Sequence, residues 1–375
     1  MILDEEALRT TEELVPGLLA DVAAYSLIDL EENPSNGIDA FRKSKAPGLL
    51  VPEVHGGKGA TALQALNFTV ALGAVAPSLT VAATMHNFTL ASMRAFEDKF
   101  HGMEWVIMDA IAHESLLVSS AGAEGRSGEG QLTPKTTAVR RGDDWVINGS
   151  KKPCSLSRSM DLLSASVQLI EDGHPPRLGM VLVPANVDGI EIRPFWNSPV
   201  LRGTESDEVL LKDVVVPDQL VMKVEEGDRI SFDEVQRIGL TWFTLLVSAT
   251  YLGMATTLVQ RLFESGKGTA QARSEAATEL RAALLGLERI AMTLDSPAKP
   301  QMLFDALVMR YAVQDSVQRC VRRSTEVLGG MEFINNPAIG YLNAATQAFA
   351  FHPPTRNSMW GALDEAFRGN SLEIV

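Results

Sequence analysis

A histidine precedes two prolines near the end of the chain, in the sequence AFAFHPPTR at residues 348–356. Proline fixes φ, lacks a backbone donor and pushes the preceding residue out of the helical region. We therefore expect a helix to end at His352, with the imidazole held at a rigid corner. Histidine titrates near neutrality and serves as a general acid or base. Two interpretations stand: His352 takes part in a reaction, or it only ends a helix and bonds the last carbonyls.

Other candidates for chemistry are few. His86 lies in TMHNFT, inside an apolar helical stretch, where a buried histidine with satisfied hydrogen bonds is the plainer interpretation. Cys154 and Cys320 are the only cysteines, which indicates neither a disulfide framework nor a zinc cluster. The glycine-rich stretches at 56–59 and 122–125 lack the strand and helix contexts of phosphate-binding loops.

The composition is that of a soluble globular protein, with 46% hydrophobic and 21% charged residues among 375. The net charge of −14 argues against nucleic acid or an anionic membrane as a partner, because both need a basic face. The acidic N-terminus lacks the pattern of a signal peptide. No apolar run approaches the about 18 residues of a membrane span, and Leu240–Met254 is interpreted as a buried helix. We expect a protein of a reducing compartment, the cytoplasm.

Hydrophobic periodicity divides the chain into three regions. Residues 1–112 carry apolar residues three and four apart and predict an N-terminal helical domain. Residues 113–222 predict a central β domain, and residues 223–375 a C-terminal helical domain. This α–β–α order predicts an α+β fold and excludes a doubly wound sheet.

Individual elements follow from local signals. Gly142-Asp143-Asp144 predicts a turn between two short strands. Branched residues next to Gly or Pro predict further strands at 177–184, 189–195 and 208–217. The last of three long helical patterns is expected to stop at Gly329-Gly330.

Four stretches resemble the acyl-CoA dehydrogenase superfamily. VPEVHGGKG at 51–59 resembles its P-E-x-x-G-G-x-G turn, and AVRRGDDWVINGSK at 138–151 resembles its paired strands ending in N-G-x-K. LRGTESDEVLLKDVVVP at 201–217 resembles its R-G-(S/T)-x-S stretch, and STEVLGGMEFI at 324–334 resembles its late helix ending in G-G. The resemblance covers nearly the whole chain. It implies a central β-barrel domain between helical domains, FAD between the barrel and the C-terminal helices, and a dimer or tetramer in which the neighbouring subunit touches the cofactor.

The family contacts its flavin through a Thr-Glu stretch and a Trp-Ile-Thr stretch. Alignment on N-G-x-K places Ala123 and Glu124 at the first stretch and Pro153-Cys154-Ser155 at the second. The resemblance therefore implies that the Ser155 hydroxyl donates near flavin N5, and that Ser157 does so if the register slips by two. Without the resemblance, both serines are interpreted as polar loop residues.

The resemblance implies further cofactor positions along the chain. Three glycines fall in the cofactor-facing loop, where backbone N–H groups can approach a ligand closely: Gly122, Gly125 and Gly128. Gly329 and Gly330 match the turn under the adenosine, although a plain helix C-cap explains them equally well. Glu326 stands where the family usually has glutamine. The arginine–phenylalanine–glycine element that reaches the partner's pyrophosphate is absent, and Arg273 or Lys267 could supply its positive charge.

Neither of the family's two positions for a catalytic glutamate carries an acid. Alignment of Thr355 puts Pro353 at one position, and counting back from Leu252-Gly253 puts Phe243 at the other. His352 is the candidate replacement. Some flavin-dependent monooxygenases of the family place a histidine there with a serine or threonine on the β side, and His352 with Ser155 resembles that pair.

Two more residues fall at the family's substrate side. The helix that carries His86 lines the acyl pocket in the family, with Phe243 nearby. Arg202, in the LRGT stretch, is interpreted as structural rather than catalytic.

These observations predict a flavin-dependent oxidoreductase, with two reactions left open. One is oxidation of an acyl thioester, bound to CoA or a carrier protein, across Cα–Cβ with a non-standard base and an electron-transfer partner. The other is monooxygenation of a small molecule with reduced flavin, FAD or FMN, from a separate reductase. A third hypothesis is an inactive subunit of a hetero-oligomer, which would neither carry nor take up yellow flavin.

Overall fold

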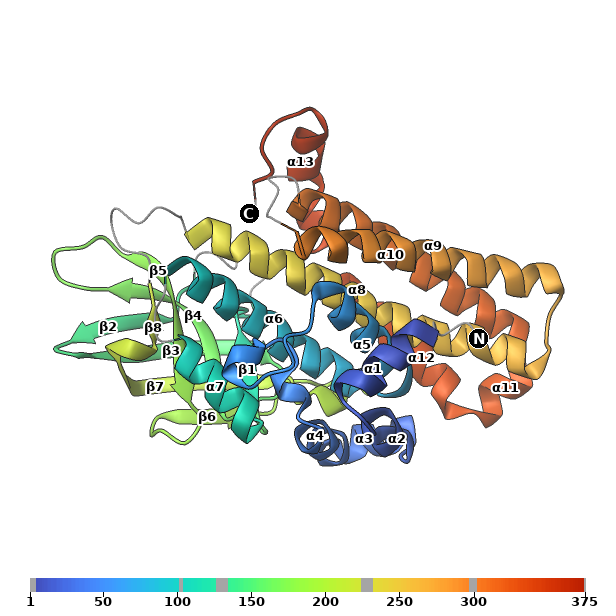
Figure 1. The fold of residues 1–375 in the computed structure, drawn as a ribbon, viewed down its shortest axis with the longest axis horizontal. Helices are drawn as coiled ribbons and strands as arrows, with labels where there is room; N and C mark the ends of the chain where they lie inside the picture. Colours follow the sequence, from blue (N-terminus) through green and yellow to red (C-terminus); the bar gives the residue numbers. More distant parts are fainter. Residues whose placement is uncertain (1–4, 101–103, 126–133, 224–231, 297–301, 374–375) are drawn as a thin grey trace.

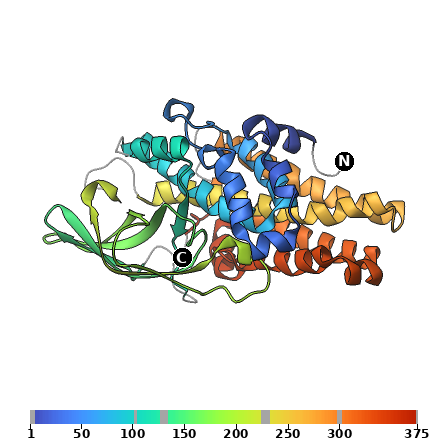
Figure 2. The same ribbon diagram turned by 90° about the horizontal axis from the view of Figure 1, so that it is seen from below.

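The computed structural model describes residues 5–100, 104–125, 134–223, 232–296 and 302–373. Both views place the sheet at one end of the molecule and the long C-terminal helices at the other (Figures 1 and 2). The N-terminal helices lie between these two ends.

The N-terminal part of the chain is helical up to Glu114. Its helices and 3₁₀ turns are α1 (Glu5–Leu14), α2 (Leu18–Ala23), α3 (Leu27–Glu32), α4 (Pro34–Lys43), η1 (Ala46–Gly48), η2 (Glu53–His55), α5 (Ala62–Val75), α6 (Pro77–Phe100) and α7 (Glu104–Glu114). Gly17, with φ of 79°, separates α1 from α2, and Pro77 separates α6 from α5. Ser26 and Asp29 form a capping box at α3.

The central part forms one sheet. Its strands and 3₁₀ turns are β1 (Val118–Ala121), β2 (Thr137–Arg141), β3 (Asp144–Cys154), β4 (Leu162–Ile170), β5 (Arg177–Pro184), β6 (Ile190–Arg193), η3 (Arg202–Thr204), β7 (Asp207–Pro217), η4 (Asp218–Leu220) and β8 (Val221–Met222). The strand order is β6-β7-β3-β2-β4-β5-β8. Strands β1 and β2 follow one another along the same edge of β4, both parallel to it.

The C-terminal part is again helical. Its elements are α8 (Phe232–Ser265), α9 (Ala270–Leu294), α10 (Met302–Leu328), α11 (Gly330–Asn335), α12 (Pro337–Gln347), η5 (Ala348–Phe351) and α13 (Arg356–Phe367). Helix α8 packs against α5 and α6 on the N-terminal side and against α9 and α10 on the C-terminal side. It is therefore the shared core helix of both helical parts.

Helix α8 is more apolar than we expected from the sequence. By length and composition, its segment Glu234–Ser265 could cross a membrane. Of its most apolar window, 83% is buried inside the fold. This burial is that of a core helix, as expected for Leu240–Met254.

Polar side chains join the three parts. The Arg42 guanidinium binds Asp161 at 2.7 Å and so ties α4 to the start of β4. The buried Glu31 carboxylate accepts from Tyr341 Oη at 2.6 Å, from the Ser78 hydroxyl and from the Gly203 N–H at 3.2 Å. Glu31 thus joins α3 and α6 to η3 and α12.

The α+β fold class and the strands predicted from turn signals are confirmed. The helix expected to stop at Gly329-Gly330 does end at Leu328. Strand β4 was missed although its apolar and polar residues alternate from Leu163 to Leu169, the pattern of a strand with one buried face; its serines Ser164 and Ser166 are buried as well. The domain boundaries at residues 112 and 222 stay a prediction.

Candidate active site

The corner at His352 is held from outside its own helix. Helix α12 ends at Gln347, η5 ends at Phe351, and His352 is extended, with φ −67° and ψ 130°. The Arg310 guanidinium, on α10, donates to the carbonyls of His352 and Pro353, the latter at 3.1 Å. The predicted helix end at His352 is therefore confirmed, and α10 rather than the prolines alone fixes the corner.

The imidazole of His352 sits among aromatic rings. Its Nε2 lies 2.7 Å from the hydroxyl of Tyr251, on α8. The Tyr251 ring stacks on Phe349, with centroids 4.7 Å apart and planes 8° apart. Phe243 meets the imidazole edge-on at 6.2 Å and also contacts Phe88 at 5.1 Å. The sequence-predicted residues His352 and Phe243 are thus brought together.

An uncompensated positive charge lies beside this cluster. Arg310 is 1% exposed and forms no ion pair with a carboxylate among the described residues, and its Nε has no partner there. Burial lowers the pKa of Arg310 to about 10. Burial, and after it the charge of Arg310, lower the pKa of His352 far below its ordinary value. The imidazole is therefore neutral near pH 7.

The β domain contributes a chain of buried hydroxyl groups. The Ser155 Oγ lies 2.9 Å from the Ser206 Oγ, which lies 2.7 Å from Thr204 Oγ1. The Ser119 hydroxyl donates to the Ser155 carbonyl at 2.6 Å. The Leu156 N–H donates to the Thr204 carbonyl, so the segment after β3 is bound to the loop before β7.

Ser157 has a different environment. It is fully buried, and its hydroxyl donates to the Glu205 carbonyl at 2.7 Å. Glu205 adopts a left-handed φ of 53°, is 7% exposed, and leaves Oε2 without a partner. Burial raises the pKa of Glu205. Ser157 is thus used to hold the loop, which leaves Ser155 as the better placed of the two serines for a cofactor.

Glu124 is engaged by the protein itself. Its carboxylate accepts from the buried Lys151 Nζ at 2.8 Å and from the Thr136 hydroxyl at 2.8 Å, together with the N–H groups of Lys135 and Thr136. Burial opposes the charged form, but these donors outweigh it and lower the pKa of Glu124 to about 2. Glu124 therefore clasps the loop after β1 to β3.

The neighbouring loop positions are not equally open, because a Cβ added at Gly125 would lie 2.8 Å from the Lys152 side chain. A Cβ added at Gly122 would meet no atom within 4 Å, and Gly125 has a φ of 69°. The Ala123 carbonyl accepts from the Lys152 N–H at 2.9 Å. Gly128 lies outside the described residues.

The residues predicted near the adenosine (Gly329 and Gly330), for the partner's pyrophosphate (Arg273) and at the family's glutamine position (Glu326) lie at the far ends of the long helices. The Arg273 guanidinium donates to the carbonyls of residues 266–268 and so holds the turn between α8 and α9. Glu326 is exposed, with Arg322 at 4.0 Å. Gly329 has a φ of 85° and caps α11, and Gly330 begins that helix. No contact among the described residues joins these positions to His352.

The two remaining candidates differ: His86 has structural partners, whereas Arg202 is exposed. The His86 Nδ1 accepts from the Val118 N–H at 3.0 Å, and its Nε2 lies 2.9 Å from the Pro47 carbonyl. Because Nδ1 accepts, Nε2 carries the proton, and burial lowers the pKa of this histidine to about 4. His86 therefore joins α6 to β1 as a satisfied core histidine. Arg202 is exposed at the start of η3.

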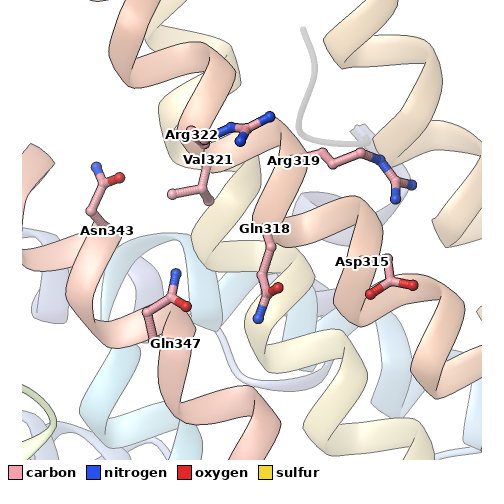
Figure 3. A pocket seen from close by; sticks show the side chains of 7 residues that line it. All are labelled: Asp315, Gln318, Arg319, Val321, Arg322, Asn343 and Gln347. Carbon is pink, nitrogen blue, oxygen red and sulfur yellow. The ribbon is translucent and has the colours of Figure 1, made fainter.

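A separate hollow of about 410 Å³ lies between α10 and α12 (Figure 3). Its lining is Asp315, Gln318, Arg319, Val321, Arg322, Asn343 and Gln347. Arg319 is paired with Glu279. The hollow has no residue from the β domain and does not coincide with the His352 cluster.

Comparison with known proteins decides the family. Residues 119–214 match the family model "Acyl-CoA dehydrogenase, middle domain". Isobutylamine N-hydroxylase of Streptomyces viridifaciens is 40% identical over 369 residues, which cover 97% of this chain and 98% of that protein. The chain belongs to the acyl-CoA dehydrogenase superfamily. It is a flavin-dependent oxidoreductase of that fold.

Solved structures agree with this fold along the whole chain. FMN-bound TdsC from Paenibacillus sp. A11-2 superposes with a TM-score of 0.81, at 18% identity, over 99% of each chain. XiaF from Streptomyces sp., in complex with FADH2 and glycerol, superposes with a TM-score of 0.78, at 15% identity, over 100% of this chain and 98% of that one.

The residues on the β side fit a flavin. Thr204 donates its hydroxyl proton to the Leu201 carbonyl at 2.8 Å, so Ser206 donates to Thr204 and Ser155 to Ser206. The Ser155 oxygen is therefore left as an acceptor for an N–H group of a flavin ring, and the open space at Gly122 allows close approach of a planar ring. The individual contacts, including the pairing of Ser155 with His352, stay predictions.

Sequence reasoning missed two residues of the site. Tyr251 is a lone phenol in the apolar helix α8, two turns after Phe243, and was taken as part of a buried pattern. Arg310 occupies an apolar stripe with Leu303, Leu307 and Val317 on α10. The available signal was a charged residue in an apolar stripe, because burying a charge is costly and indicates hydrogen bonds or a function that compensate for it.

Proposed function

We propose that this protein is a flavin-dependent monooxygenase that hydroxylates the nitrogen of a small aliphatic primary amine. Reduced flavin, FMN or FAD, from a separate reductase supplies two electrons and activates dioxygen when bound. One oxygen atom goes to the amine, which becomes a hydroxylamine, and the other leaves as water. The observation that carries the proposal is the 40% identity to an amine N-hydroxylase along 97% of the chain.

The lack of an acidic residue at the family's two base positions supports oxygenation over dehydrogenation. Removal of the α-proton of an acyl thioester needs a base, and the family's two positions for it hold Phe243 and Pro353. The groups around the imidazole of His352 are the rings of Phe243 and Tyr251 and the cation of Arg310. None of these groups accepts a proton from carbon near pH 7.

The buried charge of Arg310 also suits an amine substrate. A nitrogen atom must present its lone pair to accept oxygen, so the substrate must react as the free amine. The Arg310 cation is 1% exposed and has no carboxylate partner among the described residues, so its field disfavours an ammonium ion nearby. The aromatic wall of Phe88, Phe243 and Tyr251 would contact a short alkyl chain.

The experiment supplies the protein with NADH, a flavin reductase and a series of small primary amines, starting with isobutylamine. Mass spectrometry should find a product heavier by one oxygen atom, only when the protein, flavin and oxygen are all present. The parallel assay offers short acyl-CoA thioesters with an artificial electron acceptor. Reduction of that acceptor, with amines left unchanged, would replace the proposal by the dehydrogenase reaction.

A further inference from the structure

The hydroxyl of Tyr251 has a single hydrogen-bond partner among the described residues, the Nε2 of His352 at 2.7 Å. Tyr251 is fully buried and is fixed by stacking on Phe349. His352 keeps partial exposure, and its Nδ1 makes no hydrogen bond within the described part of the chain. This hydrogen bond can be formed in two ways. Either the Tyr251 hydroxyl donates to Nε2, or Nε2–H donates to the Tyr251 oxygen.

The need of the buried phenol proton for an acceptor decides between the two arrangements. If Nε2–H donated, the phenol proton of Tyr251 would be buried without an acceptor, which is costly. If the phenol donates, its proton is satisfied, and the remaining imidazole proton sits on Nδ1, toward the exposed side of His352.

The charges that face this pair favour the same arrangement. Arg310, on α10, opposes a positive imidazolium, so His352 keeps a lone pair. Burial raises the pKa of Tyr251, so the phenol keeps its proton. Arg356, from α13, is turned away and paired with Asp315 at 2.7 Å.

We infer that Tyr251 is a positioning residue that fixes the Nδ1–H tautomer of His352 and so makes this histidine a hydrogen-bond donor rather than a base. The inference rests on the proposed function in placing His352 at the reacting centre. A donor there stabilises an oxygen atom that gains negative charge as the O–O bond breaks. The nitrogen that could take up a proton, Nε2, is turned to Tyr251 and away from the substrate.

The tautomer can be measured without turnover, by nuclear magnetic resonance of protein labelled with ¹⁵N-histidine. The signals of His352 are assigned by their loss in His352→Asn. We expect a protonated Nδ1 and an unprotonated Nε2 in the unaltered protein. His86 provides an internal reference of the opposite tautomer, because its Nδ1 accepts from Val118.

Tyr251→Phe should convert His352 to a mixture that contains the Nε2–H tautomer. The matched control is Tyr311→Phe, which removes a hydroxyl bonded to the Pro354 carbonyl at the same corner. That control should leave the tautomer of His352 unchanged. An Nε2–H tautomer in the unaltered protein, or an unchanged tautomer in Tyr251→Phe, would overturn the inference.

Two substitutions of His352 separate the roles of its nitrogens. The amide nitrogen of Asn can overlay Nδ1, whereas that of Gln can overlay Nε2. We expect His352→Asn to retain N-hydroxylation within about tenfold, and His352→Gln to lose 10²–10⁴-fold, about the range of a positioned acid–base group. Rescue by Gln and not by Asn would contradict the donor role. If the unaltered protein makes no hydroxylamine, the proposed function fails, while the tautomer measurement still tests Tyr251.

Discussion

Replacing Glu124 with Gln tests whether the loop after β1 is clasped as the structure indicates. The carboxylate binds the Nζ of Lys151, a side chain with no exposed surface, while the Glu124 side chain is 12% exposed. Three donors from Lys135 and Thr136 complete its environment. Because Gln keeps the shape and removes the charge, the substitution isolates the electrostatic part of this clasp.

The magnitude follows from the pKa of Glu124, which falls from 4.5 to about 2 on folding. Each pKa unit corresponds to about 1.4 kcal/mol, so the charge contributes about 3 kcal/mol to the free energy of unfolding at pH 7. The folded-state pKa lies below the unfolded one, so this contribution is present above pH 4.5 and is lost as the pH falls through 2. Between pH 7 and pH 4, about 1 kcal/mol should be lost.

Urea unfolding of both proteins at pH 7, 5 and 4 measures this difference. The difference in the free energy of unfolding between the unaltered protein and Glu124→Gln should narrow as the pH falls. The matched control is Glu191→Gln, which removes a carboxylate paired with Arg193 and Lys212 on the surface. Solvent screens that carboxylate, so the difference in unfolding free energy for Glu191→Gln should be small and should vanish in about 0.5 M salt. If this difference for Glu124→Gln did not change with pH, the charge of Glu124 would not stabilise the loop after β1.

Three further predictions concern the cofactor, the loop and assembly. Ser155→Ala should remove one hydrogen bond of about 0.5–1.5 kcal/mol, so flavin affinity should fall roughly three- to tenfold in a fluorescence titration, with little change in the melting of the apo-protein. Unchanged affinity would mean that Ser155 does not touch the flavin. Glu205→Gln should raise the melting temperature at pH 8 more than at pH 4. The pKa of Glu205 is raised in the folded protein, so the folded state loses stability relative to the unfolded state as the pH rises and this carboxyl ionises. An equal effect at both pH values would mean that Glu205 is not held protonated by burial. Phe351, Trp360 and Phe367, near the C-terminus, are 76%, 52% and 68% exposed, so a second copy should cover these aromatic side chains, and light scattering should give a multiple of 40.6 kDa. A particle of the single-chain mass at micromolar concentration would contradict this.

Local signals in the sequence were enough for most of the elements, although β4 was missed, but not for the contacts between them. The turn at Gly142 and the prolines after His352 act on their immediate neighbours, so β2, β3 and the end of η5 were predictable. Tyr251 and His352 are 101 residues apart, and Arg310 reaches His352 across 42. Such pairs depend on how α8, α10 and η5 pack, which no local pattern encodes.

The roles of single residues followed the same division. His86 was interpreted as a satisfied core histidine because its helix is apolar, and its two bonds agree with that. Glu124 was predicted as a cofactor contact from its alignment, but the positions of Lys151 and Thr136, which engage its carboxylate, depend on the pairing of β3 in the sheet. The hypothesis of His352 as a base came from its type and from its alignment beside a family position for a catalytic glutamate that is not acidic here. The direction that we infer for its hydrogen bond to Tyr251, from the phenol to Nε2, makes it a donor instead.

The most direct test of the proposed reaction is a single turnover under ¹⁸O₂. The protein is loaded with reduced flavin without oxygen, mixed with isobutylamine, and then exposed to the labelled gas. Our account predicts a hydroxylamine that carries one ¹⁸O atom, in an amount that approaches that of the bound flavin. Reoxidation of the flavin with the amine unlabelled and unchanged, while an acyl-CoA thioester reduces the oxidised flavin under the same conditions, would contradict it.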